Sequence, residues 1–344
     1  MVSSPRKPKI LMVADQPNWA YDHMARFVMR ELRSKYDFYI DYCIYNLKRE
    51  PSYPKASIKR KIAAQLYRLK YSYKRRLLPE NQEYDLVCFL GWYFPYAYDF
   101  KVRGRRMVQG IFTDGFPPKG PALALDPNIA MEEFVDRYLG EAASVICGSK
   151  LIFERYKGHV KKLNYCTGAI DTKLFKPAVK TRKNERPFVV GWTGDPRRAF
   201  KGFYDFVVPA VRKASSLRPD ITLKTRFKGP YRTLPKFYLD VDVILIASAA
   251  DAGPSCFLEA GACGVPAIST RIGFPAETTQ DGENGMFVNR SVEEMAEAVV
   301  YLYDNPDLAL RMAEKIRFDI EKNWDYKARS KFWDQMFQES LSQP

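Results

Sequence analysis

The chain has 344 residues, 46% of them hydrophobic and 28% charged, a composition typical of globular domains that excludes a mostly disordered chain. Its length suggests two domains, each with its own core. The net charge of +15 is uneven, since residues 1–170 hold 29 Lys and Arg against 17 Asp and Glu, an excess of 12. This half is therefore the one expected to face an anionic partner.

The first half of the chain alternates apolar runs with amphipathic segments. Residues 9–15 (KILMVAD) form an apolar run typical of a buried strand, and residues 20–32 carry apolar side chains at helical spacing. Strands that alternate with helices predict a mostly parallel sheet covered by helices. The further elements predicted here are strands at 37–45, 84–91, 106–114 and 144–149 and a helix at 131–142.

The alternation of predicted strands and helices starts again after a break near residues 170–185. We therefore predict an α/β protein with an N-terminal domain at 1–170, a C-terminal domain at 171–320 and a helix at 321–344 that packs back toward the first domain. The elements predicted in the second half are strands at 187–194, 221–227, 241–248 and 266–270 and helices at 201–215, 256–264 and 291–305.

Residues 55–79 form a strongly basic, amphipathic segment. Its apolar side chains recur at helical spacing and are surrounded by Lys and Arg. Such a helix could lie on an anionic membrane surface or bind a nucleic-acid backbone. It could equally pack on the core with a solvated basic face, so the pattern leaves three interpretations open.

Residues 251–264 place two carboxylates around a turn of small residues, directly after the predicted strand 241–248. The loop after the carboxyl end of such a strand is where open α/β sheets bind ligands. The N-terminus of the following helix favours an anion such as phosphate. Asp251 opens the loop and Glu259 lies about one turn into the helix, so both could bind sugar hydroxyls beside a phosphate. This combination describes a nucleotide sugar, and a helix N-terminus with ordinary acids is the other interpretation.

Four motifs of the second half, in the correct order, resemble those of family-4 retaining glycosyltransferases (glycosyl transferases group 1). DAGPSCFLEAGACGVP (251–266) is similar to the family's pattern of Glu, seven residues and Glu, with Asp251 in place of the first Glu. GFPAETTQDGENGMFV (273–288), TGAIDTKLFKP (167–177) and VVGWTGDPRRAFKG (189–202) resemble three further motifs. The resemblance implies the GT-B fold, with two Rossmann-like domains facing each other across a cleft. Residues 1–166 resemble the family only in the alternation of predicted strands and helices.

The resemblance also implies roles for residues of the second domain. Lys201, with Arg197 or Arg198, would hold the donor diphosphate, and basic side chains after a glycine turn suit that ligand. Glu259 would bind the nucleotide ribose and Asp251 the donor sugar, so these two acids and Lys201 are the predicted catalytic group. The remaining predicted donor-binding residues are Gly253, Pro254, Ser255, Cys256 and, as a supporting residue, Glu277.

The acceptor is expected in the first domain, in the loops that follow its strands. The histidine usual in the family is absent there, and the segment GIFTDGFPP offers Thr113 and Asp114 instead. Asp114 could orient an acceptor hydroxyl, although Asp before Gly is also common turn chemistry. The loop after the first strand supplies three more candidates: Asp15, Asn18 and Trp19.

No metal or cofactor is expected besides a nucleotide-sugar co-substrate, linked to UDP or GDP. The only histidines are His23 and His159, and the six cysteines form no CxxC pair. These cysteines are expected to be reduced, and the initial MVSSPRKPKI lacks the apolar stretch of a secretory signal. Both features favour the cytoplasm, with the inner face of the membrane as the alternative location.

These patterns together predict a retaining transferase that moves a sugar from a nucleotide sugar to a hydroxyl. The leading acceptor is a membrane-associated glycolipid or a surface-glycan precursor, and the rival is a hydroxymethylated base of DNA. A non-catalytic binder of sugar nucleotides or nucleic acid is the alternative class. The expected partners are thus a nucleotide sugar and an anionic acceptor, membrane surface or nucleic acid, with no stable protein partner.

The basic segment provides a first test. Neutralising Lys59, Lys61, Lys70 and Lys74 together should leave donor hydrolysis intact and weaken acceptor use, most strongly at low salt, where exposed charges are least screened. If the partner is DNA, the slope of log affinity against log salt should flatten by about 0.9 for each phosphate that the protein no longer neutralises. If it is a membrane, binding to anionic vesicles should fall by about 1 kcal/mol per lysine removed near the surface. Unchanged acceptor use at every salt concentration would contradict a surface role.

Overall fold

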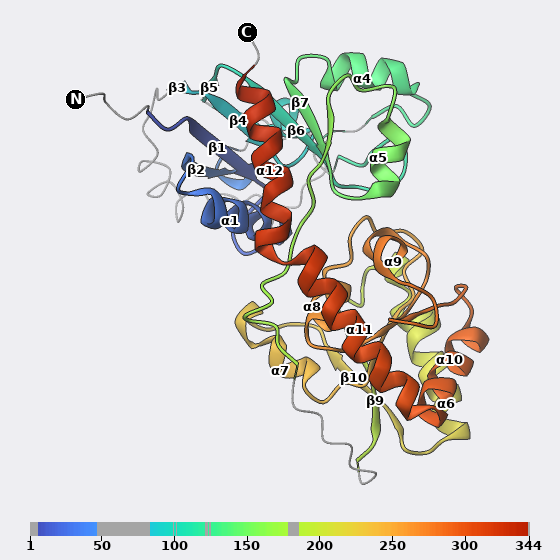
Figure 1. The fold of residues 1–344 in the computed structure, drawn as a ribbon. Coiled ribbons are helices and arrows are strands. Elements are labelled where there is room, and N and C mark those ends of the chain that lie inside the picture. Colours follow the sequence, from blue (N-terminus) through green and yellow to red (C-terminus); the bar gives the residue numbers. More distant parts are fainter. Residues whose placement is uncertain are drawn as a thin grey trace. The chain divides into compact units, whose positions relative to one another are not determined.

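The computed structural model describes residues 6–46, 83–98, 100, 102–120, 123, 125–177 and 186–342. The chain divides into two compact units (Figure 1): unit 1 is Met1–Thr167 with Ser330–Pro344, and unit 2 is Gly168–Arg329. The predicted boundaries were 170/171 and 320/321, so unit 2 reaches nine residues further along the chain than expected. The predicted basic helix at 55–79 lies outside the described residues.

Unit 1 is built on a sheet with the strand order β2–β1–β4–β6–β7–β8. All neighbouring pairs in it are parallel, as the predicted alternation of strands and helices implies. The strand order reverses between β1 and β4, because β2 lies on one side of β1 and the later strands on the other. The strands are β1 (Lys9–Ala14), β2 (Asp37–Tyr42), β4 (Leu86–Phe89), β6 (Met107–Ile111), β7 (Ser144–Cys147) and β8 (Leu163–Tyr165), beside a parallel pair of β3 (Glu83–Tyr84) and β5 (Arg103–Gly104).

The helices of unit 1 form where apolar side chains recur every three or four residues. In α1 this spacing buries Ala25, Val28 and Leu32, and the helix packs on β1. The C-terminal helix α12 also belongs largely to this unit: the buried Trp333 donates its indole N–H to the Thr167 carbonyl (3.1 Å). The helical elements are α1 (Ala20–Leu32), η1 (Cys43–Tyr45), α3 (Phe94–Ala97), α4 (Met131–Leu139), α5 (Lys150–Tyr156) and α12 (Tyr326–Leu341).

The helix predicted at 321–344 is instead the end of α11 (Pro306–Trp324) and the whole of α12, separated by Asp325. Asp325 is extended and forms a parallel β-bridge with Ile170. The Thr172 hydroxyl also donates a hydrogen bond of 2.6 Å to its carboxylate. A contact between residues more than 150 positions apart therefore interrupts the helix, and local propensity could not predict it.

Unit 2 contains a second parallel sheet, with the order β10–β9–β11–β12–β13. Here the order reverses between β9 and β11. In a doubly wound sheet, such a reversal opens a crevice at the carboxyl ends of the two strands. The strands are β9 (Phe188–Thr193), β10 (Ile221–Arg226), β11 (Val243–Ile246), β12 (Ala267–Ser269) and β13 (Met286–Phe287).

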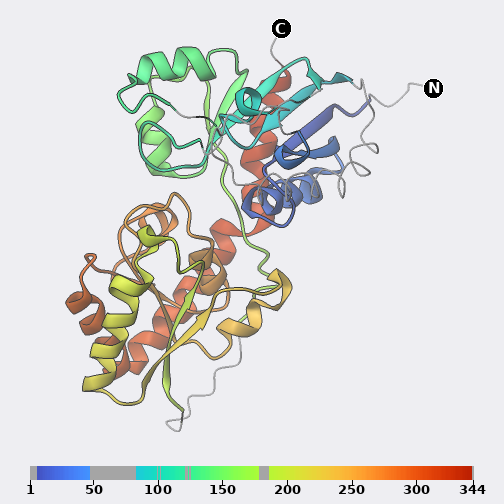
Figure 2. The ribbon, with the colours of Figure 1, turned by 180° about the vertical axis from the view of Figure 1, so that it is seen from behind.

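Helices cover both faces of this second sheet. Alternate residues of β11 point to opposite faces: Val243 and Leu245 pack with α6 and α10, and Ile244 and Ile246 pack with α8 and α11. Figure 1 shows α11 on the near side of the sheet, and Figure 2 shows the unit from behind. The helical elements are η2 (Ala199–Lys201), η3 (Phe203–Val207), α6 (Val208–Leu217), η4 (Tyr231–Thr233), α7 (Pro235–Tyr238), α8 (Ser255–Ala262), α9 (Gly273–Thr278), α10 (Val292–Asp304) and α11.

Gly202 offers a test of the packing in unit 2. Its φ is +66°, and a Cβ atom built on it would lie 2.7 Å from the Ala247 carbonyl oxygen. Gly202→Ala should therefore lower the free energy of unfolding in urea by about 1–3 kcal/mol, from backbone strain and steric overlap together. Gly282→Ala is the matched control, because Gly282 has a φ of +80° with open space around it. If both variants lose the same free energy of unfolding, the close contact with the Ala247 carbonyl adds no cost beyond the backbone strain.

Candidate functional site

The carboxyl ends of β9 and β11 lie side by side at the reversal point of the unit 2 sheet. The loop after β9 leads to Lys201, and the loop after β11 contains Asp251. The two loops are joined directly, because the Ala249 backbone N–H donates to the Phe200 carbonyl at 2.8 Å. The structure thus brings together the two segments that the sequence predicts to bind the donor.

Lys201 and Asp251 form an ion pair across these loops. The Lys201 Nζ lies 2.9 Å from the Asp251 Oδ2, and each side chain is only 18% exposed. The other carboxylate oxygen accepts a hydrogen bond from the Gly253 N–H at 3.3 Å. Because an ammonium group has three donors, Lys201 can keep Asp251 as a partner and still bind a phosphate oxygen.

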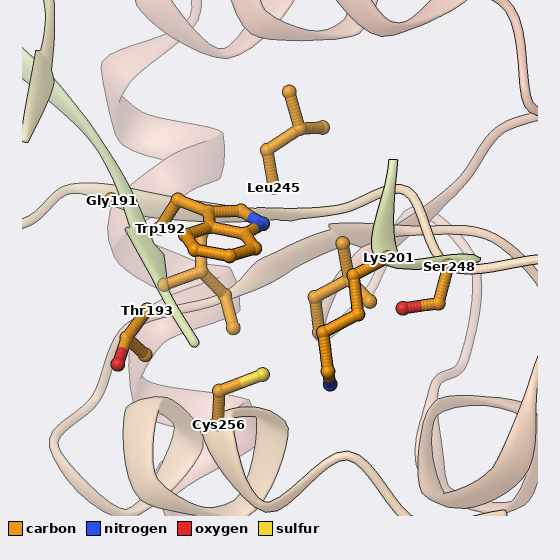
Figure 3. Close-up of a pocket in the computed structure, with 9 residues that line it drawn as sticks. Gly191, Trp192, Thr193, Lys201, Leu245, Ser248 and Cys256 are labelled. Carbon is orange, nitrogen blue, oxygen red and sulfur yellow. The ribbon is translucent and has the colours of Figure 1, made fainter. Parts of the chain in front are cut away.

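A small pocket opens beside this ion pair, on the carboxyl ends of β9 and β11 (Figure 3). Figure 3 shows the Lys201 side chain lying between Ser248, from the loop after β11, and Cys256, from α8. Burial raises the pKa of the Cys256 thiol to about 12, so this group is neutral. The pocket combines an apolar floor with few polar groups, and its lining residues are Gly191, Trp192, Thr193, Lys201, Ile244, Leu245, Ile246, Ser248 and Cys256.

Helix α8 begins at the edge of the same site. Pro254 precedes it, and no side chain caps its N-terminus, so its first backbone N–H groups are available to an anion. The preceding loop packs closely on α9: a Cβ atom on Gly253 would lie 2.4 Å from the Phe274 ring. Gly253 is therefore required by packing. Ser255 starts α8, and Glu277 lies half-buried on α9.

Glu259 lies on α8 and is almost fully buried, with 6% of its surface exposed. The Tyr238 hydroxyl donates to its Oε2 at 2.8 Å. Burial raises the pKa of Glu259 to about 7, and the hydrogen bond from Tyr238 and the charges of Lys201 and Arg226 only partly oppose this rise. The Glu259 carboxyl group therefore stays protonated to a higher pH than an exposed glutamate does.

The two arginines proposed for the diphosphate are exposed. Arg197 donates to the Asp195 carboxylate through its Nε and Nη2 atoms, both at 2.9 Å. Its guanidinium is the main reason why the pKa of Asp195 falls to about 2. Arg198 lies next to η2 with its side chain exposed. The structure thus gives Arg197 a local carboxylate partner and brings Lys201, but not Arg197, to Asp251.

The predicted acceptor residues lie after two strands of unit 1. Asp15 follows β1, and burial raises its pKa. Asn18 has a φ of +64° and donates its N–H to the Asp22 carboxylate at 2.8 Å, next to Trp19, which is 54% exposed. After β6 come the two remaining candidates, Thr113 and Asp114.

Asp114 and Thr113 have different environments. Asp114 accepts hydrogen bonds from the Gly115 N–H (2.8 Å) and from the Arg155 Nη1 (2.9 Å), so its carboxylate shapes the turn and is paired. The Thr113 hydroxyl is buried without a hydrogen-bond partner among the residues described. The strands β1 and β6 are separated in the sheet by β4.

Sequence reasoning missed three residues that shape the donor site. Tyr238 binds Glu259, Ser248 lines the pocket, and Arg290 joins the two donor loops. The Arg290 Nε donates to the Ala247 carbonyl at 2.9 Å, and its Nη2 donates to the Ala199 carbonyl at 3.4 Å. The guanidinium carbon lies 4.2 Å from the centre of the Phe206 ring. Ser248 could have been found, because it ends the predicted strand 241–248. Tyr238 and Arg290 are 21 and 43 residues from their partners, and no local pattern marks them.

The described ranges hold neither a cluster of metal ligands nor a membrane-spanning helix. Within them, no group of three or more His, Cys, Asp or Glu side chains could hold a metal ion. No helix in this part of the chain is long and apolar enough to cross a membrane. All six cysteines lie in the described ranges and form no disulfide, and Cys256 alone among them is partly exposed.

Residues 213–318 match the family Glycosyl transferases group 1. The matched residues all belong to unit 2 and make up about a third of the chain. Over 109 residues it is 28% identical to the D-inositol 3-phosphate glycosyltransferase of Arthrobacter sp. (strain FB24). That match covers 31% of this chain and 25% of the relative, so only a quarter of the relative's length is spanned.

Solved structures match nearly the whole chain. Sucrose-phosphate synthase from Thermosynechococcus elongatus superposes with a TM-score of 0.67 and 13% identity, over 96% of this chain and 98% of that one. Anabaena HepE in complex with UDP and glucose has a TM-score of 0.64 and 14% identity, over 96% and 99%. A glycosyltransferase from Rickettsia africae has a TM-score of 0.64 and 13% identity, over 99% and 100%. The fold is GT-B, which confirms the predicted fold class of two Rossmann-like α/β units.

Glu259 leads to a prediction on pH. Its folded-state pKa of about 7 lies above the ordinary 4.5, so between these values the folded chain holds a proton that the unfolded chain has released. The free energy of unfolding should fall as pH rises through this range, by on the order of 3 kcal/mol. Glu259→Gln cannot ionise and should lack this decline when urea unfolding is measured from pH 4.5 to 7. Parallel pH profiles for the two proteins would contradict the raised pKa.

Proposed function

We propose that the protein is a retaining glycosyltransferase that moves a sugar from a nucleotide sugar to a hydroxyl of its acceptor. The observation that carries this proposal is the meeting of Lys201, Asp251 and the uncapped N-terminus of α8 at the reversal point of the unit 2 sheet. A cation and backbone N–H groups suit a diphosphate, and a carboxylate beside them suits sugar hydroxyls. The matched family and the GT-B fold support the same reaction class.

Each residue then has a definite role in binding the donor. Lys201 and the first N–H groups of α8 bind the diphosphate, and Asp251 binds hydroxyls of the donor sugar. Glu259 binds the ribose through its ionised carboxylate, which accepts the two hydroxyl hydrogen bonds; burial, which raises its pKa, opposes this ionised form. Gly253 to Cys256 form the turn that lies against the phosphate, and Glu277 supports this turn through α9. Arg197 reaches the diphosphate only by leaving Asp195.

In the reaction, one bond forms and one bond breaks at the anomeric carbon of the donor sugar. The acceptor oxygen bonds to this carbon on the face from which the diphosphate oxygen leaves, and the acceptor proton passes to the departing phosphate. Negative charge grows on the diphosphate in the transition state, so Lys201 and the α8 N-terminus stabilise it where it forms. The protein otherwise contributes by positioning the two substrates.

The similar solved structures and the basic charge of residues 1–170 support the proposed substrates. HepE is solved with UDP and with UDP-glucose, which favours a UDP-linked donor here over a GDP-linked one. The matched relative is named D-inositol 3-phosphate glycosyltransferase. The basic excess of residues 1–170 favours an acceptor carried by an anionic surface, and we propose a glycolipid or surface-glycan precursor at the inner face of the membrane.

Lys201→Ala tests the donor site. The variant should bind UDP-glucose more weakly by about 1.5–3 kcal/mol, because it cannot form a charge-assisted hydrogen bond to the diphosphate, and isothermal titration calorimetry measures this. Lys213→Ala is the control, since Lys213 forms an exposed ion pair with Glu293 and should leave the affinity unchanged. If the wild type binds neither UDP- nor GDP-sugars, the proposed function is wrong; if it binds but both variants match it, Lys201 is not in the site.

A further inference from the structure

We propose that Asp251 sets a ligand preference of the donor site: it favours the intact nucleotide sugar and opposes the nucleoside diphosphate that remains after transfer. The inference rests on the proposed function, because it takes the site at the carboxyl ends of β9 and β11 to bind a UDP-sugar. It assigns to Asp251 a second effect besides contact with the donor sugar, namely repulsion of the spent nucleotide.

The pocket has little net charge, although its proposed ligand is an anion. Among the described residues that line it, Lys201 alone is charged. The Lys201 Nζ lies 2.9 Å from the Asp251 Oδ2, and each side chain is only 18% exposed, so water screens the pair weakly. A carboxylate at this distance offsets much of the attraction between Lys201 and a phosphate. Binding of a diphosphate alone therefore does not account for Asp251, because the pocket would hold that ligand better without it.

Three arginines at the carboxyl edge of the same sheet are held by other groups. Arg197 donates from its Nε and Nη2 to the Asp195 carboxylate, both at 2.9 Å. Arg226 and Arg290 each donate to a backbone carbonyl, also at 2.9 Å. The ion pair therefore sets the charge that a ligand meets in the pocket itself.

The backbone around Asp251 holds its carboxylate in place. The Oδ1 atom accepts a hydrogen bond from the Gly253 N–H at 3.3 Å. The loop is also tied to the Lys201 loop, because the Ala249 N–H donates to the Phe200 carbonyl at 2.8 Å. A ligand that enters the pocket cannot displace the carboxylate without breaking these contacts, so it meets a fixed negative charge.

The intact donor and the spent nucleotide differ in charge and in hydroxyl groups. Each phosphate of a UDP-sugar carries one negative charge. The terminal phosphate of UDP can ionise a second time, with a pKa of about 6 as for other phosphate monoesters, so UDP has nearly one more negative charge at neutral pH. Sugar hydroxyls donate hydrogen bonds to a carboxylate, whereas a carboxylate repels the extra charge of UDP. Asp251 therefore stabilises the bound donor and destabilises the bound product.

Asp251→Asn tests this preference, because asparagine keeps an oxygen for the Gly253 N–H but has no charge. Isothermal titration calorimetry of the full chain at neutral pH, with EDTA to remove metal ions, measures the affinities for UDP-glucose and for UDP. The variant should bind UDP-glucose about tenfold more weakly, since the sugar hydroxyls lose a charged acceptor. It should bind UDP about threefold more tightly, since the terminal phosphate becomes the counter-ion of Lys201.

A third ligand and two further variants separate charge from other effects. UDP β-methyl ester has the charge of a UDP-sugar but no sugar hydroxyls, so its response to Asp251→Asn should lie between those of UDP-glucose and UDP. Asp251→Glu retains the negative charge, so UDP should bind to it as weakly as to the wild type. Asp251→Ser also removes the charge, and it replaces Asp251→Asn in the titrations if that variant does not fold.

Asp242→Asn is the matched control. Asp242 lies just before β11, at the opposite end of the strand from Asp251, and its side chain is 16% exposed. It forms an ion pair with Arg186 and accepts a hydrogen bond from the Val189 N–H at 2.8 Å, so its burial and partners resemble those of Asp251. This variant should bind UDP-glucose and UDP like the wild type.

The outcomes separate this inference from the proposed function. Opposite changes for UDP-glucose and UDP in Asp251→Asn, absent from Asp242→Asn, support the inference. If Asp251→Asn weakens both ligands by the same factor, or changes neither, Asp251 does not discriminate between them; the inference is then wrong, while the proposed function stands. If the wild type binds neither UDP-glucose and UDP nor their GDP counterparts, the proposed function is wrong and the inference falls with it.

Discussion

The ion pair between Lys201 and Asp251 is the interaction on which the donor side of the molecule depends. Both side chains are mostly buried, at 18% exposure each, and removing two charges from water is costly unless they meet in good geometry. The backbone bond from Ala249 to Phe200 and the hydrogen bond from Arg290 keep the two loops at this distance. The ion pair therefore forms only when both loops are held in place. Removal of either side chain would leave the other charge buried and uncompensated.

The same pair sets the electrostatic environment of Glu259. Burial favours the neutral carboxyl group, and the ammonium of Lys201 is one of the few groups that favour its ionised form. A negatively charged diphosphate placed beside Lys201 would weaken this support, whereas ribose hydroxyls that donate to the carboxylate would strengthen it. The ionisation of Glu259 therefore depends on whether a nucleotide occupies the site, because Lys201 interacts with both the carboxylate and the diphosphate.

The sequence was informative wherever a pattern is local. Alternating apolar and amphipathic segments predicted both parallel sheets. The position of a loop after a strand predicted a ligand site at Asp251, and the family resemblance implied that Lys201 binds the same ligand. Local patterns failed where distant residues decide the structure. The helix predicted at 201–215 begins only after Gly202, where the backbone is left-handed and lies close to the Ala247 carbonyl. Tyr238 meets Glu259 by tertiary packing alone.

The break at Asp325 has a consequence for the order in which the chain can fold during synthesis. Unit 2 is continuous, from Gly168 to Arg329, whereas unit 1 is completed by residues that follow it. A ribosome therefore synthesises every residue of unit 2 before it adds Trp333 and Phe337, which cover Phe27 and Tyr36. Until then, aromatic surface of the first-made unit stays open to solvent and to chaperones. Unit 1 begins first in the sequence but is therefore the last to fold completely. A stop codon between Arg329 and Trp333 would leave unit 2 whole and unit 1 without its C-terminal helix residues.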